Sequence, residues 1–154
     1  MTRQITLLWL LSTLLLFAVS PKELLGSWQY QRKFADSDEQ HSESEKLTFA
    51  PGSFHLILSV TIRKGDDHRI ERLRIRADGL WKLRKETLVL VIEQIRFLDV
   101  AATHGIDKNS LTQLIRDLRG RYLSDPIRIL DLISVHAGRL RLDTQEGTKE
   151  YRRF

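Results

Sequence analysis

The residue types that most often carry out chemistry are present in this chain, but their spacing forms no catalytic or metal-binding motif. The five histidines have no metal-ligand spacing to one another or to a carboxylate; they are His41, His55, His68, His104 and His136. The chain has no cysteine, which excludes thiol catalysis and thiolate metal sites. No nucleophile elbow, phosphate-binding glycine loop or dinucleotide fingerprint occurs. The sequence therefore predicts a protein that is not an enzyme and that needs no cofactor or metal.

One acidic segment resembles the opening of a calcium-binding loop. Asp36, Asp38 and Glu39 supply carboxylates at its start, but the sixth position of such a loop requires glycine and is His41 here. Residues 35–45 as a whole are polar and acidic. We therefore interpret them as a hydrated loop and not as a calcium site.

A second group of residues has the chemistry needed to bind an amphipathic small molecule. Such a site combines an apolar cavity with a few cations for an acid group. The candidate lining residues are Phe54, Leu56, Leu58, Leu90 and Ile92, with Arg72 and Arg74 for the acid. The alternative is that the apolar residues are packed core and that the arginines form a solvated face.

Short strands separated by turns must position these residues. Period-two alternation and turn signals predict strands near residues 24–34, 46–50, 54–62, 72–76, 81–83, 87–95, 127–135, 140–142 and before 151. Asp78-Gly79 is predicted to be a tight hairpin, with further turns at Pro51-Gly52, Ala137-Gly138 and Glu146-Gly147. The stretch 87–95 is apolar on both faces, which indicates that a partner or a packed helix covers it.

One helix is predicted to interrupt the strands. Leu111, Leu114, Ile115 and Leu118 have helical spacing, with Asn109 or Ser110 as the cap and Gly120 as the end. About eight strands and one helix predict a mainly β protein, a small antiparallel β-barrel. The Gly-x-Trp at Gly26 and Trp28, and the second tryptophan at Trp81 after Gly79, resemble the structural motif of lipocalins.

The first twenty residues predict export. Arg3 is the only charge in residues 1–20, and an apolar run follows it, which is the pattern of a secretory signal. Pro21 is a poor residue to follow a cleavage site, so the segment is either a cleaved signal or an uncleaved anchor. Residues 21–154 are long enough for a single domain with its own core.

The charge composition argues against nucleic-acid binding. The chain has 25 basic and 20 acidic residues, a net charge of +5, and the two signs are interspersed. Without cysteine the exported domain must be stabilised by its core and not by disulfides.

From residue 47 to the C-terminus the order of short segments resembles that of the ToxS family. Members of this family are membrane-anchored periplasmic accessory proteins of ToxR-type transmembrane transcriptional activators. The matching segments are residues 47–54, 59–60, 78–83, 88–91, 95–99, 110–115, 128–133, 140–142 and 150–154. Trp28-Gln29 also matches near the start. The sequence departs from the family in its short acidic stretch before residue 47 and in its basic 72–76 face.

This resemblance implies a lipocalin-like barrel in the periplasm, held in the bacterial inner membrane by an uncleaved segment over residues 1–20. It also implies a partner, the periplasmic domain of a ToxR-type activator, which the protein would bind and stabilise as a heterodimer. In such pairs the joint barrel takes up bile salts. A free periplasmic lipocalin-like carrier of a small apolar ligand is the alternative.

Overall fold

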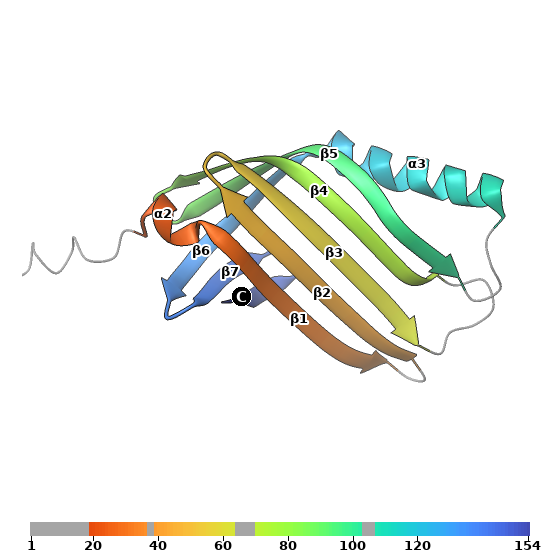
Figure 1. The fold of residues 1–154 in the computed structure, drawn as a ribbon, viewed down its shortest axis with the longest axis horizontal. Helices are drawn as coiled ribbons and strands as arrows, with labels where there is room; N and C mark the ends of the chain where they lie inside the picture. Colours follow the sequence, from red (N-terminus) through yellow and green to blue (C-terminus); the bar gives the residue numbers. More distant parts are fainter. Residues whose placement is uncertain (1–18, 37–38, 64–69, 103–106) are drawn as a thin grey trace, which may run out of the picture.

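The chain folds into a closed antiparallel β-barrel. The computed structural model describes residues 19–36, 39–63, 70–102 and 107–154 (Figure 1). The elements are α2 (Pro21–Leu24), β1 (Gly26–Asp36), β2 (Glu39–Ala50), β3 (Ser53–Arg63), β4 (Ile70–Arg84), β5 (Thr87–Ala102), α3 (Lys108–Ser124), β6 (Ile127–His136), β7 (Arg139–Thr144) and β8 (Gly147–Arg153). Each strand pairs with the next along the chain, and β8 pairs with β1 to close the barrel. This up-and-down order is the lipocalin architecture, so the predicted fold class is confirmed.

The wall of the barrel is longer on one side than on the other. Strands β1 to β5 have 11 to 16 residues, whereas β6, β7 and β8 have 6 to 10. β8 pairs with β1 only at residues 28–29, and β6 pairs with β5 only at residues 87–91. The far halves of the five long strands therefore extend beyond the short strands, and α3 runs along this part of β5 (Figure 1).

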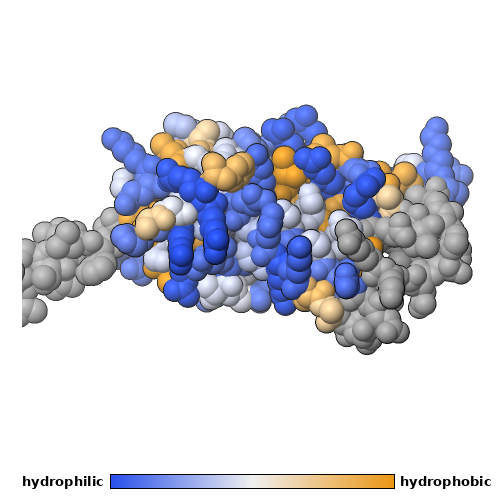
Figure 2. All heavy atoms as spheres, turned by 60° about the horizontal axis from the view of Figure 1, so that its bottom comes forward, coloured by the Kyte–Doolittle hydropathy of each residue, from blue (hydrophilic) through white to orange (hydrophobic). Residues whose placement is uncertain are grey.

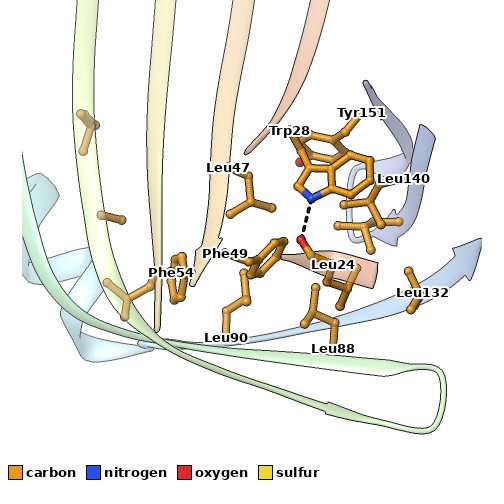
Figure 3. Close-up of a cluster of buried hydrophobic side chains, with 14 of the residues drawn as sticks. Leu24, Trp28, Leu47, Phe49, Phe54, Leu88, Leu90, Leu132, Leu140 and Tyr151 are labelled. Atoms are coloured by element: carbon orange, nitrogen blue, oxygen red, sulfur yellow. Dashed lines mark hydrogen bonds between the residues drawn. The ribbon is translucent and has the colours of Figure 1, made fainter. Parts of the chain in front are cut away.

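The opposite end of the barrel is filled by large apolar side chains. The most deeply buried are Leu24, Trp28, Phe49, Leu88, Leu140 and Leu142. Figure 3 shows the first five of these side chains packed together. The indole Nε1 of Trp28 donates a hydrogen bond of 2.7 Å to the carbonyl of Leu24, which ties α2 across this end. A capping box between Ser20 and Glu23 holds the start of α2. The core is thus concentrated at the end where the described chain begins.

The hairpin predicted at Asp78-Gly79 does not form, because β4 continues through both residues to Arg84. The register of β4 against β5 shifts at this point, and the turn lies at Lys85-Glu86 instead. A Cβ atom on Gly79 would lie 1.9 Å from the carbonyl oxygen of Val91. Glycine is therefore needed for a close approach of two strands at a bulge, and not for a turn.

The prediction of an acidic loop over residues 35–45 is wrong, because β1 continues to Asp36 and β2 begins at Glu39. Alternate residues of β2 face inward, so Glu43 and Glu45 lie on the same face as Leu47 and Phe49. Strand formation is compatible with this acidic sequence because the inward carboxylates have partners inside the barrel, described below.

The predicted helix is confirmed, but its ends differ from the prediction. Asp107 is the N-cap, and its side chain accepts hydrogen bonds from the backbone N–H groups of Asn109 and Ser110. The helix passes through Gly120 to Ser124, and Gly120 does not have the positive φ that a glycine helix stop adopts.

The predicted anchor, residues 1–20, lies almost entirely outside the described residues. Among the helices that the structure describes, none combines the length and apolar composition needed to cross a membrane.

Candidate functional site

The five apolar residues predicted to line a cavity all lie on the inner face of the barrel. Cross-strand pairs place Phe54 beside Gly79 and Gly79 beside Ile92, while Leu58 pairs with Ile75. Phe54, Leu90 and Ile92 are 3%, 6% and 8% exposed and belong to the core. Leu56 and Leu58 are half-buried and lie nearer the end where β1 to β5 extend beyond the short strands, which we call the open end. The structure thus brings the five together, with three of them in the packed core.

Arg72 and Arg74 lie on the opposite face of the sheet. Their cross-strand partners on β3 are Thr61 and Ser59, so they alternate with the inward residues Leu73 and Ile75. Both arginines are exposed, and Arg72 forms an ion pair of 2.5 Å with Asp99 on the outside. Because neighbouring strand positions face opposite sides, these arginines cannot meet a ligand that lies against the inward leucines.

The four residues of the predicted structural motif have distinct roles. Gly26 begins β1 with a φ of +110°, which an L side chain rarely adopts. Trp28 closes the core, and Gly79 allows the approach of Val91 described above. Trp81 donates from Nε1 to the carbonyl of Ala50 at 2.7 Å and packs edge-on against Phe49. All four residues thus have structural roles in the described barrel.

Sequence reasoning missed a buried polar cluster inside the barrel, which consists of Glu43, Glu45, Lys149 and Tyr151. The Nζ of Lys149 lies 2.5 Å from Oε1 of Glu45 and 3.5 Å from Oε1 of Glu43. The Tyr151 hydroxyl donates to the other oxygen of Glu45 at 2.5 Å. Lys149 also pairs with the exposed Glu146 at 3.1 Å. The only signal in the sequence was the period-two spacing of Glu43 and Glu45 ahead of Leu47.

Burial and charge shift the protonation of this cluster. Desolvation raises the pKa of the Glu43 carboxyl, and the charge of Lys149 partly offsets this rise. Burial lowers the pKa of Lys149, but hydrogen bonding and the charge of Glu45 outweigh that effect and raise it above its ordinary value. Burial, followed by the charge of Glu45, raises the pKa of Tyr151, so its hydroxyl stays protonated as a donor. Lys149 is therefore neutralised by carboxylates and does not attract an anion.

An apolar patch covers part of the outer surface of β4, β5 and β6. It consists of Leu80, Val89, Val91, Ile127 and Ile129, which we call the β4–β6 patch. The register joins Leu80 to Val91 and Val91 to Ile127 in one row, and Val89 to Ile129 in the next. Leu80, Ile127 and Ile129 are 48%, 51% and 66% exposed. The stretch 87–95 was predicted to be apolar on both faces. Its outward residues Val89 and Val91 lie beside exposed aliphatic residues of β4 and β6.

A second apolar surface lines the inside of the projecting strands. Its residues are all half-buried, and we call them the open-end face: Leu58, Val60, Ile62, Leu73, Phe97 and Val100. The apolar stripe of α3 is likewise only half-buried, and α3 has no fully buried residue. Apolar surface at this end is thus only partly covered by the described chain.

Two surface depressions flank the barrel. One of about 410 Å³ lies beside α2 and the β6–β7 turn, and is lined by Lys22, Glu23, Trp28, Arg153 and residues 135–138. The other, of about 520 Å³, lies at the β1–β2 hairpin and includes Lys33 and Phe34. None of the five predicted apolar residues lines either depression. Within the described residues, no group of three or more acidic or histidine side chains is placed to hold a metal ion.

No protein-family model and no curated protein matches the chain. Solved structures that are similar to it include two Bacteroides proteins. A lipocalin-like protein from Bacteroides uniformis ATCC 8492 has 18% identity and a TM-score of 0.47, over 86% of this chain and 99% of that one. An uncharacterized protein from Bacteroides eggerthii DSM 20697 has 13% identity and a TM-score of 0.46, over 85% of this chain and 99% of that one.

Proposed function

We propose that this protein is a non-enzymatic accessory protein that binds and stabilises the periplasmic domain of a ToxR-type transmembrane activator. In this proposal residues 1–20 hold it in the bacterial inner membrane, and the barrel lies in the periplasm. The observation that most supports a protein partner is the β4–β6 patch. The identity of the partner rests on the resemblance to the ToxS family.

The β4–β6 patch has the composition of an interface centre. Outward positions of an antiparallel sheet are usually polar when they face water. Here the most exposed residues of the patch are aliphatic: Ile127 is 51% exposed and Ile129 is 66% exposed. Contiguous exposed aliphatic surface on a soluble domain is typical of a site for another protein. Covering it would remove apolar area from water at roughly 25 cal/mol per Å².

The patch is continuous with an unpaired length of β5. Ile127 is the first residue of β6, so no described strand pairs with the β6 side of β5 beyond Val91, where α3 packs along the strand. An unpaired strand edge is able to accept a strand or a helix from another chain. A partner that contacts the patch is therefore expected to extend along β5 and α3 toward the open end.

We further propose that partner and barrel together form a pocket for an amphipathic ligand such as a bile salt. The apolar body of the ligand would lie against the open-end face, where Leu58, Val60 and Leu73 are half-buried. The acid group would need a cation at the mouth, because Lys149 is already paired with carboxylates. Arg32 is exposed on β1 and supplies such a cation, and the partner supplies any other. The same open-end face would serve a free periplasmic carrier of an apolar ligand, which is the alternative.

Co-expression with the periplasmic domain of the cognate activator tests the proposal. We expect a heterodimer by size-exclusion chromatography with light scattering, and slower proteolysis of the activator domain. Ile129→Glu should weaken the heterodimer at least about tenfold without unfolding the barrel, because Ile129 is largely exposed in the free protein. Phe34→Glu is the control, an apolar residue of β1 that is 40% exposed and lies away from the patch, β5 and α3.

Two results would contradict this proposal. Barrel and activator domain that remain separate at micromolar concentration would exclude the partnership. A lipid found by mass spectrometry in a monomeric protein that lacks residues 1–20 would favour the free carrier.

A further inference from the structure

The end of the barrel at which the described chain begins carries exposed basic side chains. α2, the β4–β5 turn, the β6–β7 turn and the last residues of β8 all lie toward this end (Figure 1). Their basic residues are all exposed, and we call them the basic end: Lys22, Arg84, Lys85, Arg139, Arg152 and Arg153. Exposed acidic residues in or beside the same segments are Glu23, Glu86 and Glu150. Hydrophilic side chains dominate the visible part of this end in Figure 2.

Most of the charge at the basic end is not neutralised by side chains that the structure describes. Within the described residues, Arg139 alone of the six forms an ion pair, with Glu150 at 3.8 Å. The carboxylate of Glu23 accepts from the backbone N–H of Ser20 at 2.7 Å, so it is engaged in capping α2. A set of exposed cations without carboxylate partners attracts anions from solution.

The depression of about 410 Å³ beside α2 gives this charge a concave centre, because both Lys22 and Arg153 line it. The guanidinium of Arg153 stacks over the Trp28 ring at 4.5 Å and donates to the carbonyl of Glu23 at 2.8 Å. The backbone N–H of Arg153 donates to the carbonyl of Gly138 at 2.8 Å, which ties β8 to the β6–β7 turn. Arg153 is thus held in place by three separate contacts.

We propose that the basic end docks against the anionic phospholipid headgroups of the membrane that holds the N-terminal segment. This inference rests on the proposed function, because an anchor over residues 1–20 ends directly at α2 and so holds the basic end within a Debye length of the headgroups. A headgroup phosphate enters the depression between Lys22 and Arg153. Docking fixes the barrel upright, so that the open end points away from the bilayer and the β4–β6 patch faces sideways, accessible to a partner in the same membrane.

The chain has no cysteine, so single-cysteine variants of the full protein can be labelled at one chosen position. Glu86→Cys labels the basic end, and Gln40→Cys labels the far hairpin between β1 and β2. The full chain is placed in nanodiscs of phosphatidylcholine, with or without phosphatidylglycerol, and energy transfer to a headgroup dye is measured. Transfer from residue 86 should be at least about twofold higher with phosphatidylglycerol and should fall at high salt, while transfer from residue 40 stays low.

Charge reversal provides the second arm of the experiment. Lys22→Glu combined with Lys85→Glu should abolish the response to phosphatidylglycerol, whereas Lys33→Glu, an exposed lysine at the far hairpin, should leave it unchanged. Equal transfer in both lipids, or an equal loss with Lys33→Glu, would overturn the docking.

The outcomes also separate this inference from the proposed function. A chain that is not retained in nanodiscs would overturn the anchor, and the docking with it. A chain that is retained and binds its partner in detergent, but whose orientation ignores lipid charge, would overturn the docking alone.

Discussion

Replacing Lys149 with methionine removes the cation from the polar cluster and tests whether that cluster stabilises the barrel. The side chains of Lys149 and Glu45 are only 12% and 9% exposed, so solvent screens their attraction little. Breaking such a buried pair from one side costs about 3–5 kcal/mol. In the variant, Glu45 keeps its hydrogen bond from Tyr151, and Glu43 is 20% exposed and so remains partly hydrated. Both effects reduce the cost of the unpaired carboxylates, so we expect the free energy of unfolding to fall by the lower limit, about 3 kcal/mol. For a domain of this size that loss lowers Tm by about 10 °C.

The dependence of this loss on pH identifies its cause. Without Lys149, the desolvation that already raises the pKa of Glu43 is no longer offset, so the folded pKa lies further above the unfolded value. A carboxyl with a raised folded pKa adds stability below its unfolded pKa, and that stability is lost as pH rises through the folded pKa. The deficit of Lys149→Met should therefore be largest at pH 7 and should shrink as the pH falls toward about 5.

Urea denaturation of the wild type and variant at several pH values measures this effect. Lys82→Met, at an exposed lysine of β4, is the matched control and should change the free energy of unfolding by less than about 0.5 kcal/mol. Combining Lys149→Met with Glu45→Gln should cost less than the sum of the single changes, because the uncompensated charge is removed. A deficit that is the same at pH 5 and pH 7, or no larger than that of Lys82→Met, would refute the reasoning.

Two further changes test how the closed end and the β4 bulge are built. Trp28→Phe should lower the free energy of unfolding by about 1–3 kcal/mol, because the fully buried Trp28 donates to the Leu24 carbonyl; urea denaturation followed by circular dichroism measures it. Gly79→Ala should destabilise the barrel by about 3 kcal/mol or more, since its Cβ would meet the backbone of Val91. Gly120→Ala in α3 is the comparison: its Cβ would meet nothing within 4 Å, so it should stabilise the protein by about 0.5–1 kcal/mol. Thermal unfolding of the two alanine variants side by side tests that opposite sign, and a harmless Gly79→Ala would contradict the bulge.

Features encoded by neighbouring residues could be predicted from the sequence. The alternation from Phe54 to Ile62 predicted β3 because one face of the strand is inside the barrel and the other is outside. The turn at Ala137-Gly138 is confirmed, and both residues have positive φ values of 48° and 73°. These signals are local, so no knowledge of distant contacts was needed to interpret them.

Features that depend on distant contacts could not be predicted in this way. Their acidic composition made residues 35–45 resemble a hydrated loop. The residue that compensates Glu45 is Lys149, which is 104 positions away and gives no local signal. Asp78-Gly79 is a strong local hairpin signal, but the deciding contact is with Val91 on the next strand. The face to which an arginine of β4 points depends on the register of the whole strand, which bulges on β4 and β5 alter.

The arrangement of charge in this barrel is the reverse of what a simple anion carrier needs. The inner carboxylates of Glu43 and Glu45 outnumber their one lysine, while Arg72 and Arg74 stand on the outside. An anionic amphipath would therefore lose its hydration deep in the barrel without gaining a free cation, and the packed core leaves its apolar body no room at the closed end. Any such ligand must be held at the open end, where β1 to β5 extend beyond the short strands β6 to β8. In the proposed heterodimer, ligand binding and partner binding are therefore expected to be coupled, since the partner would cover the open end and complete the site.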